Sequence, residues 1–242
     1  TNGEKAANRY IISNNKTALN VMQLFAMLKL VAFDKELTID ICPLFETIED
    51  LENASDVMKS LYTNPTYLAH LQKRKLKQNI MLGFSDGTKD GGYLMANWAI
   101  YKAKQMLTSI SRKNKVDVIF FDGRGGPPAR GGGKTHKFYA SLGPSIESKE
   151  VQLTVQGQTI SSNFGTLDSS KYNIEQLMSS GILNKLNETD LTISKDCYET
   201  MNNLSKISYD AYVKFKNHPK FLSYLEHMST LKYYSKTNVG SR

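Results

Sequence analysis

Apolar and polar residues alternate between two kinds of segment over most of the chain. Short runs rich in β-branched and aromatic residues are separated by longer segments in which apolar residues recur every three or four positions. The short runs cover residues 10–12, 37–45, 80–84 and 116–121, and a further extended run covers 151–160. Near-continuous apolar runs that alternate with helical segments are typical of parallel βα units, whose strands are buried on both faces.

Helical periodicity is clearest in residues 20–31, 48–62 and 93–110. Thr47 and Asp50 stand where a capping box would open the second of these segments. From about 171 to 236 the chain is rich in Tyr, Leu and Met, and we expect helices there with breaks at Gly181 and Pro219. The pattern therefore predicts an α/β fold with parallel strands, either a barrel or an open sheet.

Composition narrows the class of protein. The 242 residues are 40% hydrophobic and 22% charged, which excludes a disordered or collagen-like chain. Two cysteines are too few for a disulfide scaffold or a cysteine zinc site, and no segment contains the ~20 apolar residues that a transmembrane helix needs. The polar start carries no signal peptide, so we expect an intracellular protein, and the ends at Thr1 and Arg242 suggest a piece of a larger one.

Charge and glycine are distributed unevenly. The 31 basic and 23 acidic residues give a net charge of +8, which suits nucleic acid, an acidic membrane surface or small anions as partners. Of the 16 glycines, four lie in 83–92 and six in 123–133, where the chain must bend sharply or let a ligand approach its backbone. Neither segment has the spacing of a P-loop, a dinucleotide-binding loop or an EF-hand.

Charged residues directly follow the predicted strands. Glu46 follows the second strand, Asp86 the third and Arg124 the fourth. The carboxyl ends of parallel strands lie at one edge of a sheet or barrel, where such folds keep their chemistry. We therefore expect these three side chains to converge.

Two kinds of chemistry follow from that placement. A divalent cation between Glu46 and Asp86 would offset the repulsion of two carboxylates, and oxygen ligands favour Mg²⁺ or Mn²⁺. Lys89, together with Arg124 and Arg130 on glycine-rich backbone, suits a phosphate or carboxylate group. The alternatives are ordinary ones: each carboxylate could cap a helix, and each arginine could form a structural salt bridge.

The two glycine-rich segments resemble a known family. Residues 83–92, GFSDGTKDGG, and 121–136, FDGRGGPPARGGGKTH, are similar to the patterns GYSDSxKDAG and FHGRGGxxGRGGGPTH of phosphoenolpyruvate carboxylases. Further matches in the same order and spacing lie at 10–13, 43–47, 154–157, 164–165 and 238–242. The resemblance covers essentially the whole chain and a middle-to-late part of the family's much longer chain.

The resemblance implies an enzyme that adds bicarbonate to phosphoenolpyruvate and forms oxaloacetate and phosphate with Mg²⁺ or Mn²⁺, an anaplerotic carbon fixation that feeds the tricarboxylic acid cycle. Phosphoryl transfer to bicarbonate would release CO₂, which the enolate then attacks. The implied fold is a partial parallel β/α (TIM-like) barrel with extensive additional helices. About 1–165 would form the βα units and about 166–242 the helical part of one fragment of a larger catalytic domain. The implied enzyme is a cytoplasmic homotetramer that binds neither nucleic acid nor membrane.

The family's site residues can be transferred motif by motif. Glu46 and Asp86 would be the metal ligands, and Lys89 and Arg124 would line the anion site. Arg130 would hold carboxyphosphate or the enolate. The implied substrate-binding residues are Arg242, which would grip the phosphate, and Gly125, Gly126 and Gln156.

Two departures qualify the resemblance. Asp122 replaces the histidine that is usual in the family's motif, which changes the charge beside the carboxylation site. The family's catalytic histidine lies in an N-terminal motif that the chain lacks, and further arginines lie beyond Arg242, so we expect the isolated chain to be inactive. Two other hypotheses remain: a nucleic-acid-binding module built on the Arg-Gly-Gly repeats, and a non-catalytic relative.

Overall fold

The sheet is the centre of the molecule. The computed structural model describes residues 7–32, 35–126, 131–155, 157–186, 193–230 and 233. Within these residues five strands form one sheet in sequence order, and every neighbouring pair is parallel. The strands are β1 (Arg9–Ile12), β2 (Asp40–Phe45), β3 (Lys77–Gly83), β4 (Asp117–Gly123) and β5 (Val151–Leu153).

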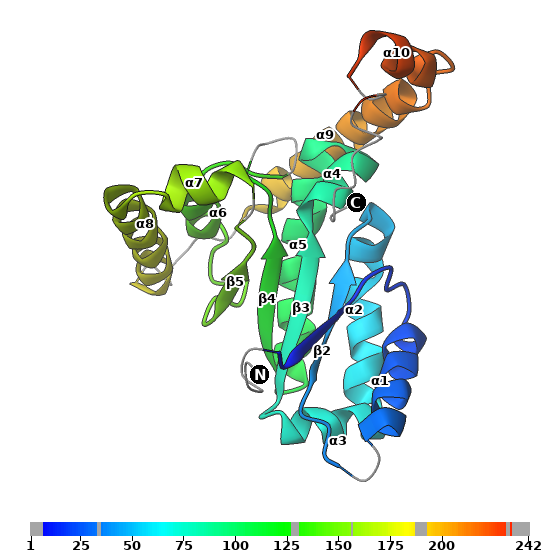
Figure 1. The fold of residues 1–242 in the computed structure, drawn as a ribbon, viewed down its shortest axis with the longest axis vertical. Coiled ribbons are helices and arrows are strands. Elements are labelled where there is room, and N and C mark those ends of the chain that lie inside the picture. The colour runs from blue at the N-terminus through cyan, green and yellow to red at the C-terminus, as the bar shows by residue number, and fades with distance from the viewer. Residues whose placement is uncertain are drawn as a thin grey trace.

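Helices connect the strands and continue beyond them. The connecting helices are α1 (Ala18–Ala32), α2 (Ile48–Thr63), α3 (Pro65–Lys73), α4 (Phe84–Gly91), α5 (Tyr93–Lys113) and α6 (Thr135–Ala140). Parallel neighbours in sequence order require crossovers of one hand, so α1, α2 and α5 lie on the same face of the sheet (Figure 1). After β5 follow α7 (Gln158–Phe164), α8 (Leu167–Leu186), α9 (Lys195–Lys216) and α10 (Phe221–Met228).

The core lies between that face of the sheet and its helices. Inward-facing residues of β2, β3 and β4 pack against α2 and α5, and the centre is fully buried. Its members include Phe45, Leu51, Met58, Ile80 and Leu107, none with measurable exposure. Burying a side chain of this size stabilises the fold by about 1.5–3 kcal/mol, so this layer holds the strands in place.

Several expectations are confirmed. The parallel α/β architecture is present, although hydrogen bonds do not close the sheet into a barrel. The predicted capping box opens α2: the Thr47 hydroxyl accepts from the Asp50 N–H, and the Asp50 carboxylate accepts from the Thr47 N–H, both at 3.1 Å. Pro219 lies between α9 and α10, as expected for a helix break.

Other expectations are wrong in instructive ways. The glycine-rich segment 83–92, where a sharp bend or the approach of a ligand was expected, contains α4. Its glycines permit close packing: a Cβ on Gly91 would lie 2.7 Å from Ile48 Cγ1. The expected extended run 151–160 is shorter in the structure, where β5 ends at Leu153. Gly157, with a φ of 59°, directly precedes α7. Gly181 does not break α8, because one glycine costs a helix only about 1 kcal/mol.

The boundaries of three strands also differ from those expected from the sequence. The expected strand 37–45 begins only at Asp40, and the expected strand 80–84 runs from Lys77 to Gly83. The fourth strand includes Asp122 and Gly123, which places Asp122 inside the sheet. The polar residues Lys77 and Asp117 at the starts of β3 and β4 belong to the sheet although they are exposed.

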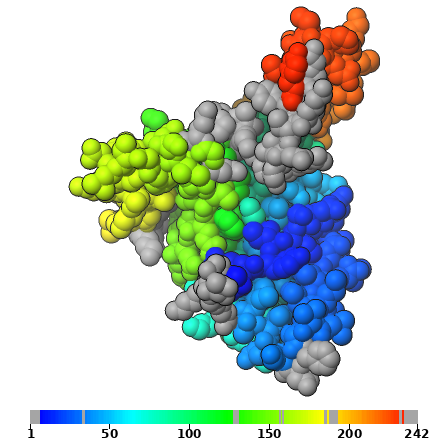
Figure 2. Space-filling view, in the orientation of Figure 1, coloured from blue at the N-terminus to red at the C-terminus, as the bar shows by residue number. Residues whose placement is uncertain are grey.

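Two helical parts project from the βα body, α7–α8 in yellow-green on one side and α10 in orange-red at the top (Figure 2). On α8, apolar side chains recur every fourth position and are 49–74% exposed: Ile174, Met178, Ile182 and Leu186.

Among the described residues, no helix is both long enough and apolar enough to cross a membrane.

An aromatic cluster fixes α3 to α1. The ring of His70 is buried, and its centroid lies 5.2 Å from that of Phe25 and 6.1 Å from that of Tyr67. Burial lowers the pKa of His70 from its ordinary value, and the nearby Arg74 cation acts in the same direction. The cluster therefore holds a neutral imidazole.

We expect this histidine to make stability depend on pH. Below pH ~6.5 the unfolded chain takes up a proton at His70, whereas the folded chain does so only at lower pH, so the free energy of unfolding falls as the pH drops. Unfolding by urea at pH 7.5, 6.5 and 5.5 should give a steeper loss for the native chain than for His70→Phe. The other histidines are present in both proteins and cancel; equal slopes would contradict the prediction.

Candidate functional site

Buried polar atoms without a partner mark one edge of the sheet. Among the described residues, such atoms belong to Asn15, Ser85, Asp122 and Arg124. Asn15 follows β1, Ser85 follows β3, and the other two lie at the end of β4. An unpaired buried polar group costs free energy, so their concentration at the carboxyl ends of the strands indicates a site where another molecule supplies partners.

Glu46 lies at this edge because the backbone of β3 approaches it closely. It follows β2 and is half-buried, and its Oε1 accepts a hydrogen bond from the N–H of Asn14 at 3.0 Å. A Cβ on Gly83 would lie 2.7 Å from Glu46 Cβ, so only glycine leaves room for the glutamate there. This carboxylate is thus held between the ends of β1 and β3.

Asp86 and Lys89 both lie on α4, which begins where β3 ends. Lys89 Nζ lies 3.0 Å from Asp86 Oδ1, and the two side chains are 62% and 42% exposed. A Cβ on Gly87, between them, would lie 3.5 Å from the carbonyl oxygen of Glu46, so α4 packs directly against the end of β2. The structure brings the two predicted metal ligands to adjacent elements, and it pairs one of them with the predicted anion-binding lysine.

The last turn of α4 is fixed by contacts with two other helices. Asp90 accepts a hydrogen bond from the N–H of Ile48 at 3.0 Å and thereby ties α4 to the first turn of α2. From α9, Lys216 donates to the carbonyl of Asp90 at 2.9 Å, and the Tyr212 hydroxyl donates to that of Lys89 at 2.9 Å. These contacts fix the last turn of the helix that carries Asp86 and Lys89.

Glu46 and Asp86 alone would provide only part of a metal site. No three His, Cys, Asp or Glu side chains gather as a metal-binding group in the described part of the chain. Mg²⁺ commonly binds through one or two carboxylates and takes its other ligands from water and substrate phosphate. The Glu46 carboxylate, held by the N–H of Asn14, and the Asp86 carboxylate are the kind of oxygen donors that such an ion takes.

Arg124 is buried and held by the glycine-rich segment. Its Nη2 donates to the carbonyl of Gly132 at 3.1 Å, and its Nη1 lies 3.4 Å from both the carbonyl of Gly133 and the hydroxyl of Thr135. Its Cζ lies 4.6 Å from the centre of the Phe138 ring. Burial lowers the pKa of Arg124, but an arginine retains its charge in proteins. The alternative, a structural salt bridge, is not found among these contacts, and Nε has no partner.

The glycines after β4 let the backbone fold tightly around this guanidinium. Gly131 has a φ of 72°, and a Cβ on it would lie 2.5 Å from Phe84 Cβ. The N–H of Gly133 donates to the carbonyl of Gly126 at 3.1 Å, which closes the segment on itself. Gly125 is buried and Gly126 is half-buried beside Arg124. Of the other expected site residues, Arg130, Gln156 and Arg242 lie outside the described residues.

Sequence reasoning noted Asp122 but missed its partners. Asp122 has no exposure, and its Oδ2 accepts from Lys104 Nζ at 2.8 Å and from the Tyr139 hydroxyl at 2.7 Å. Lys104 comes from α5 and Tyr139 from α6. Lys104 follows Ile100 by four positions and precedes Leu107 by three, so its place on the apolar face of α5 was the available signal.

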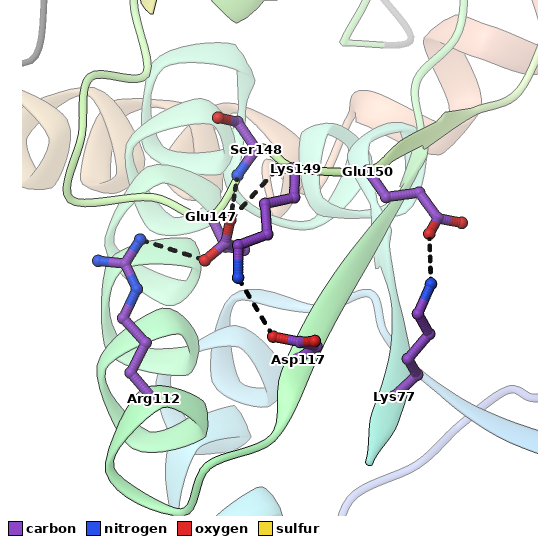
Figure 3. Close-up of polar contacts among 7 residues, drawn as sticks. All are labelled: Lys77, Arg112, Asp117, Glu147, Ser148, Lys149 and Glu150. Carbon is purple, nitrogen blue, oxygen red and sulfur yellow. Dashed lines mark hydrogen bonds and ion pairs between the residues drawn. The ribbon is translucent and has the colours of Figure 1, made fainter. Parts of the chain in front are cut away.

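The opposite edge of the sheet differs in kind. At the amino ends of β3 and β4, exposed side chains of opposite charge form ion pairs (Figure 3). Lys77 pairs with Glu150 at 2.9 Å, and Lys149 pairs with Asp117 at 3.3 Å. These four charges have partners within the chain, whereas the carboxyl edge holds the buried polar atoms that lack them.

Comparisons with known proteins identify the family. The sequence profile of the phosphoenolpyruvate carboxylase family matches residues 1–242. A phosphoenolpyruvate carboxylase of Corynebacterium diphtheriae is 32% identical over 241 residues, which are 99% of this chain and 26% of that protein. The chain therefore spans about a quarter of the length of this curated relative. Both matches confirm the resemblance carried by the two glycine-rich segments, and the chain belongs to the phosphoenolpyruvate carboxylase family.

Proposed function

We propose that this chain forms part of an enzyme that carboxylates phosphoenolpyruvate with bicarbonate and yields oxaloacetate and phosphate. The observation that carries the proposal is the cluster of buried, unpartnered polar atoms at the carboxyl edge of the sheet, next to Glu46 and Asp86. Family membership supplies the reaction class. Phosphoenolpyruvate carries a phosphate and a carboxylate, which suits an edge with Lys89 and Arg124.

The chain's own residues would bind and orient the substrate. Lys89 is exposed and flexible enough to turn from Asp86 toward a phosphate or carboxylate. Arg124 is fixed by backbone carbonyls and the Phe138 ring, so its positive charge is preorganised beside the place where negative charge develops. Arg130, Gln156 and Arg242 are further proposed contacts by motif, with Gly125 and Gly126 providing backbone.

Glu46 and Asp86 would hold Mg²⁺ or Mn²⁺. When bound, the ion would act as a Lewis acid toward the oxygens of the substrate. Asn14 keeps the Glu46 carboxylate in place, and Asp90 and Lys216 keep α4 in place, so the two ligands would not need to rearrange.

The chain would act within a longer polypeptide. It spans 26% of its relative, and α8 presents a row of apolar side chains at its surface. We propose that the sheet is part of a β/α barrel in a single larger catalytic domain, and that the complete enzyme is a cytoplasmic homotetramer. The nucleic-acid hypothesis has no support, since Arg124 is buried and engaged within the chain.

The metal site can be tested on the chain itself. Glu46→Gln and Asp86→Asn should each weaken Mn²⁺ binding about ten-fold or more, because each removes a charged oxygen ligand from a site with few. Titration followed by the electron paramagnetic resonance signal of free Mn²⁺ measures the change. Asp56→Asn removes an exposed carboxylate from α2 and serves as the control. Equal binding by all four proteins would refute the assignment.

Lys89→Met should have the opposite effect on the metal. Removing the ammonium that lies 3.0 Å from Asp86 frees this carboxylate, so Mn²⁺ affinity should rise about two- to five-fold, the range expected for losing an exposed pair worth ~0.4–1 kcal/mol. Binding of phosphoenolpyruvate in the presence of Mn²⁺ should weaken in the same variant. A fall in metal affinity would mean that Lys89 does not compete for Asp86.

The reaction is tested by comparing the chain with the longer polypeptide encoded by the same gene. With Mg²⁺, bicarbonate and phosphoenolpyruvate, the longer protein should form oxaloacetate, measured through NADH oxidation by added malate dehydrogenase. The chain by itself should give no rate above the blank, and Asp86→Asn should abolish the rate of the longer protein. Turnover by the isolated chain, or none by the longer protein, would contradict the proposal.

A further inference from the structure

We propose that Lys104, Asp122 and Tyr139 are positioning residues for Arg124: a buried, charge-paired network that fixes α6 and thereby the place of the guanidinium. This inference rests on the proposed function for its catalytic meaning. Its structural content stands on contacts at the end of β4 that the proposed reaction does not use directly.

The network joins three elements at one carboxylate. Lys104 and Asp122 are 1% and 0% exposed, and the 2.8 Å contact between them links α5 to β4. The Tyr139 hydroxyl donates to the same oxygen, Oδ2, at 2.7 Å and links α6 to β4. A buried carboxylate oxygen that accepts from one ammonium and one hydroxyl has a single geometry of low energy. The three elements are therefore held at fixed separations.

The charges in the network depend on one another. Burial lowers the pKa of Lys104, and the neighbouring Asp122 carboxylate opposes that shift. Burial also raises the pKa of Tyr139, as does the negative charge of Asp122, so the hydroxyl remains a donor. Removing one member would leave a buried charge without its counterpart, which is costly.

Arg124 is coupled to this network through α6. Thr135 and Phe138, both on α6, contact the guanidinium: the Thr135 hydroxyl lies 3.4 Å from Nη1, and the Phe138 ring centre lies 4.6 Å from Cζ. The same ring lies 5.2 Å from Lys104 Nζ, so Phe138 packs against both cations. The next residue along α6 is Tyr139, whose hydroxyl anchors the helix to Asp122.

The Tyr139 hydroxyl is one of the contacts that hold α6 beside Arg124. The others include the Ser180 hydroxyl, which donates to the carbonyl of His136 at 2.9 Å, and the Phe84 ring, which packs edge-on against Phe138. Without the bond from Tyr139 to Asp122, we expect the turn of α6 that carries Phe138 to shift. Arg124 keeps the bond from Nη2 to the Gly132 carbonyl at 3.1 Å, but its contacts at Nη1 are long and its Nε has no partner, so the packing of Phe138 contributes to its position. A small displacement of a positioned charge is enough to reduce catalysis strongly.

Tyr139→Phe tests this inference on the chain. It removes one oxygen and keeps the ring. In ¹⁵N-labelled protein, the Nε–H signal of Arg124, identified by its loss in Arg124→Lys, should be shifted upfield by the Phe138 ring. In Tyr139→Phe this shift should fall by about half or more. Tyr67→Phe is the matched control, since it removes another buried hydroxyl that donates at 2.9 Å, to Gln78, away from the network.

A second variant keeps the test valid if Tyr139→Phe folds poorly. Lys104→Met combined with Asp122→Asn removes both buried charges together, and it should also reduce the ring-current shift. The exposed pair at the other end of β4 supplies its control, Lys149→Met with Asp117→Asn (Figure 3), which should leave the Arg124 signal unchanged. An Arg124 signal at its native position in both folded network variants would overturn the proposal.

Kinetics then separate this inference from the proposed function. In the longer polypeptide, Tyr139→Phe should lower kcat about ten-fold or more with KM for phosphoenolpyruvate within about two-fold, whereas Tyr67→Phe should leave both unchanged. If the ring-current shift is lost but kcat is not, the network positions Arg124 and the assigned role of Arg124 in the reaction is wrong. If the shift persists in the network variants, the positioning itself is wrong, whatever the activity.

Discussion

Parallel pairing in register is the constraint on which the candidate site depends. Phe45 pairs with Leu82, and Gly83 pairs with Gly123, so the ends of β2, β3 and β4 are level. Glu46 can lie beside β3 only because Gly83 has no side chain. A slip of one residue would turn Asp122 away from α5 and leave its charge without Lys104. Register, more than any single contact, brings acidic and basic side chains to one edge.

The polar groups at the two edges of the sheet differ in how buried they are and in whether they have partners. At the amino edge, charged side chains such as Lys77 and Glu150 are exposed and paired, which costs little and stabilises little. At the carboxyl edge, polar atoms of Asn15 and Ser85 are buried without partners. The fold tolerates this cost because the apolar layer under β2, β3 and β4 is fully buried. A binding site is the place where such unpaired groups gain partners.

Local sequence patterns predicted much of the fold and of the candidate site. They failed where contacts between residues distant in sequence determine the structure. Period and capping signals gave the parallel α/β fold and the start of α2, because those depend on neighbours in sequence. Placing Glu46 and Asp86 on adjacent strand ends followed from the general rule for parallel sheets. The helix α4 was missed, since its glycines are explained by packing against Ile48 and Glu46, which no local pattern reveals. Lys104 was missed because its counter-charge lies on another element.

The pair of Lys104 and Asp122 explains how this chain can depart from its family's motif. Where the motif has a histidine, position 122 carries no fixed negative charge, and a lysine buried at 104 would lack compensation. With Asp122 present, the same burial that destabilises the ammonium strengthens its attraction to the carboxylate. Removing either member alone would leave a charge unpaired in the interior. In this chain the lysine and the aspartate therefore compensate each other, and together they link α5 to β4.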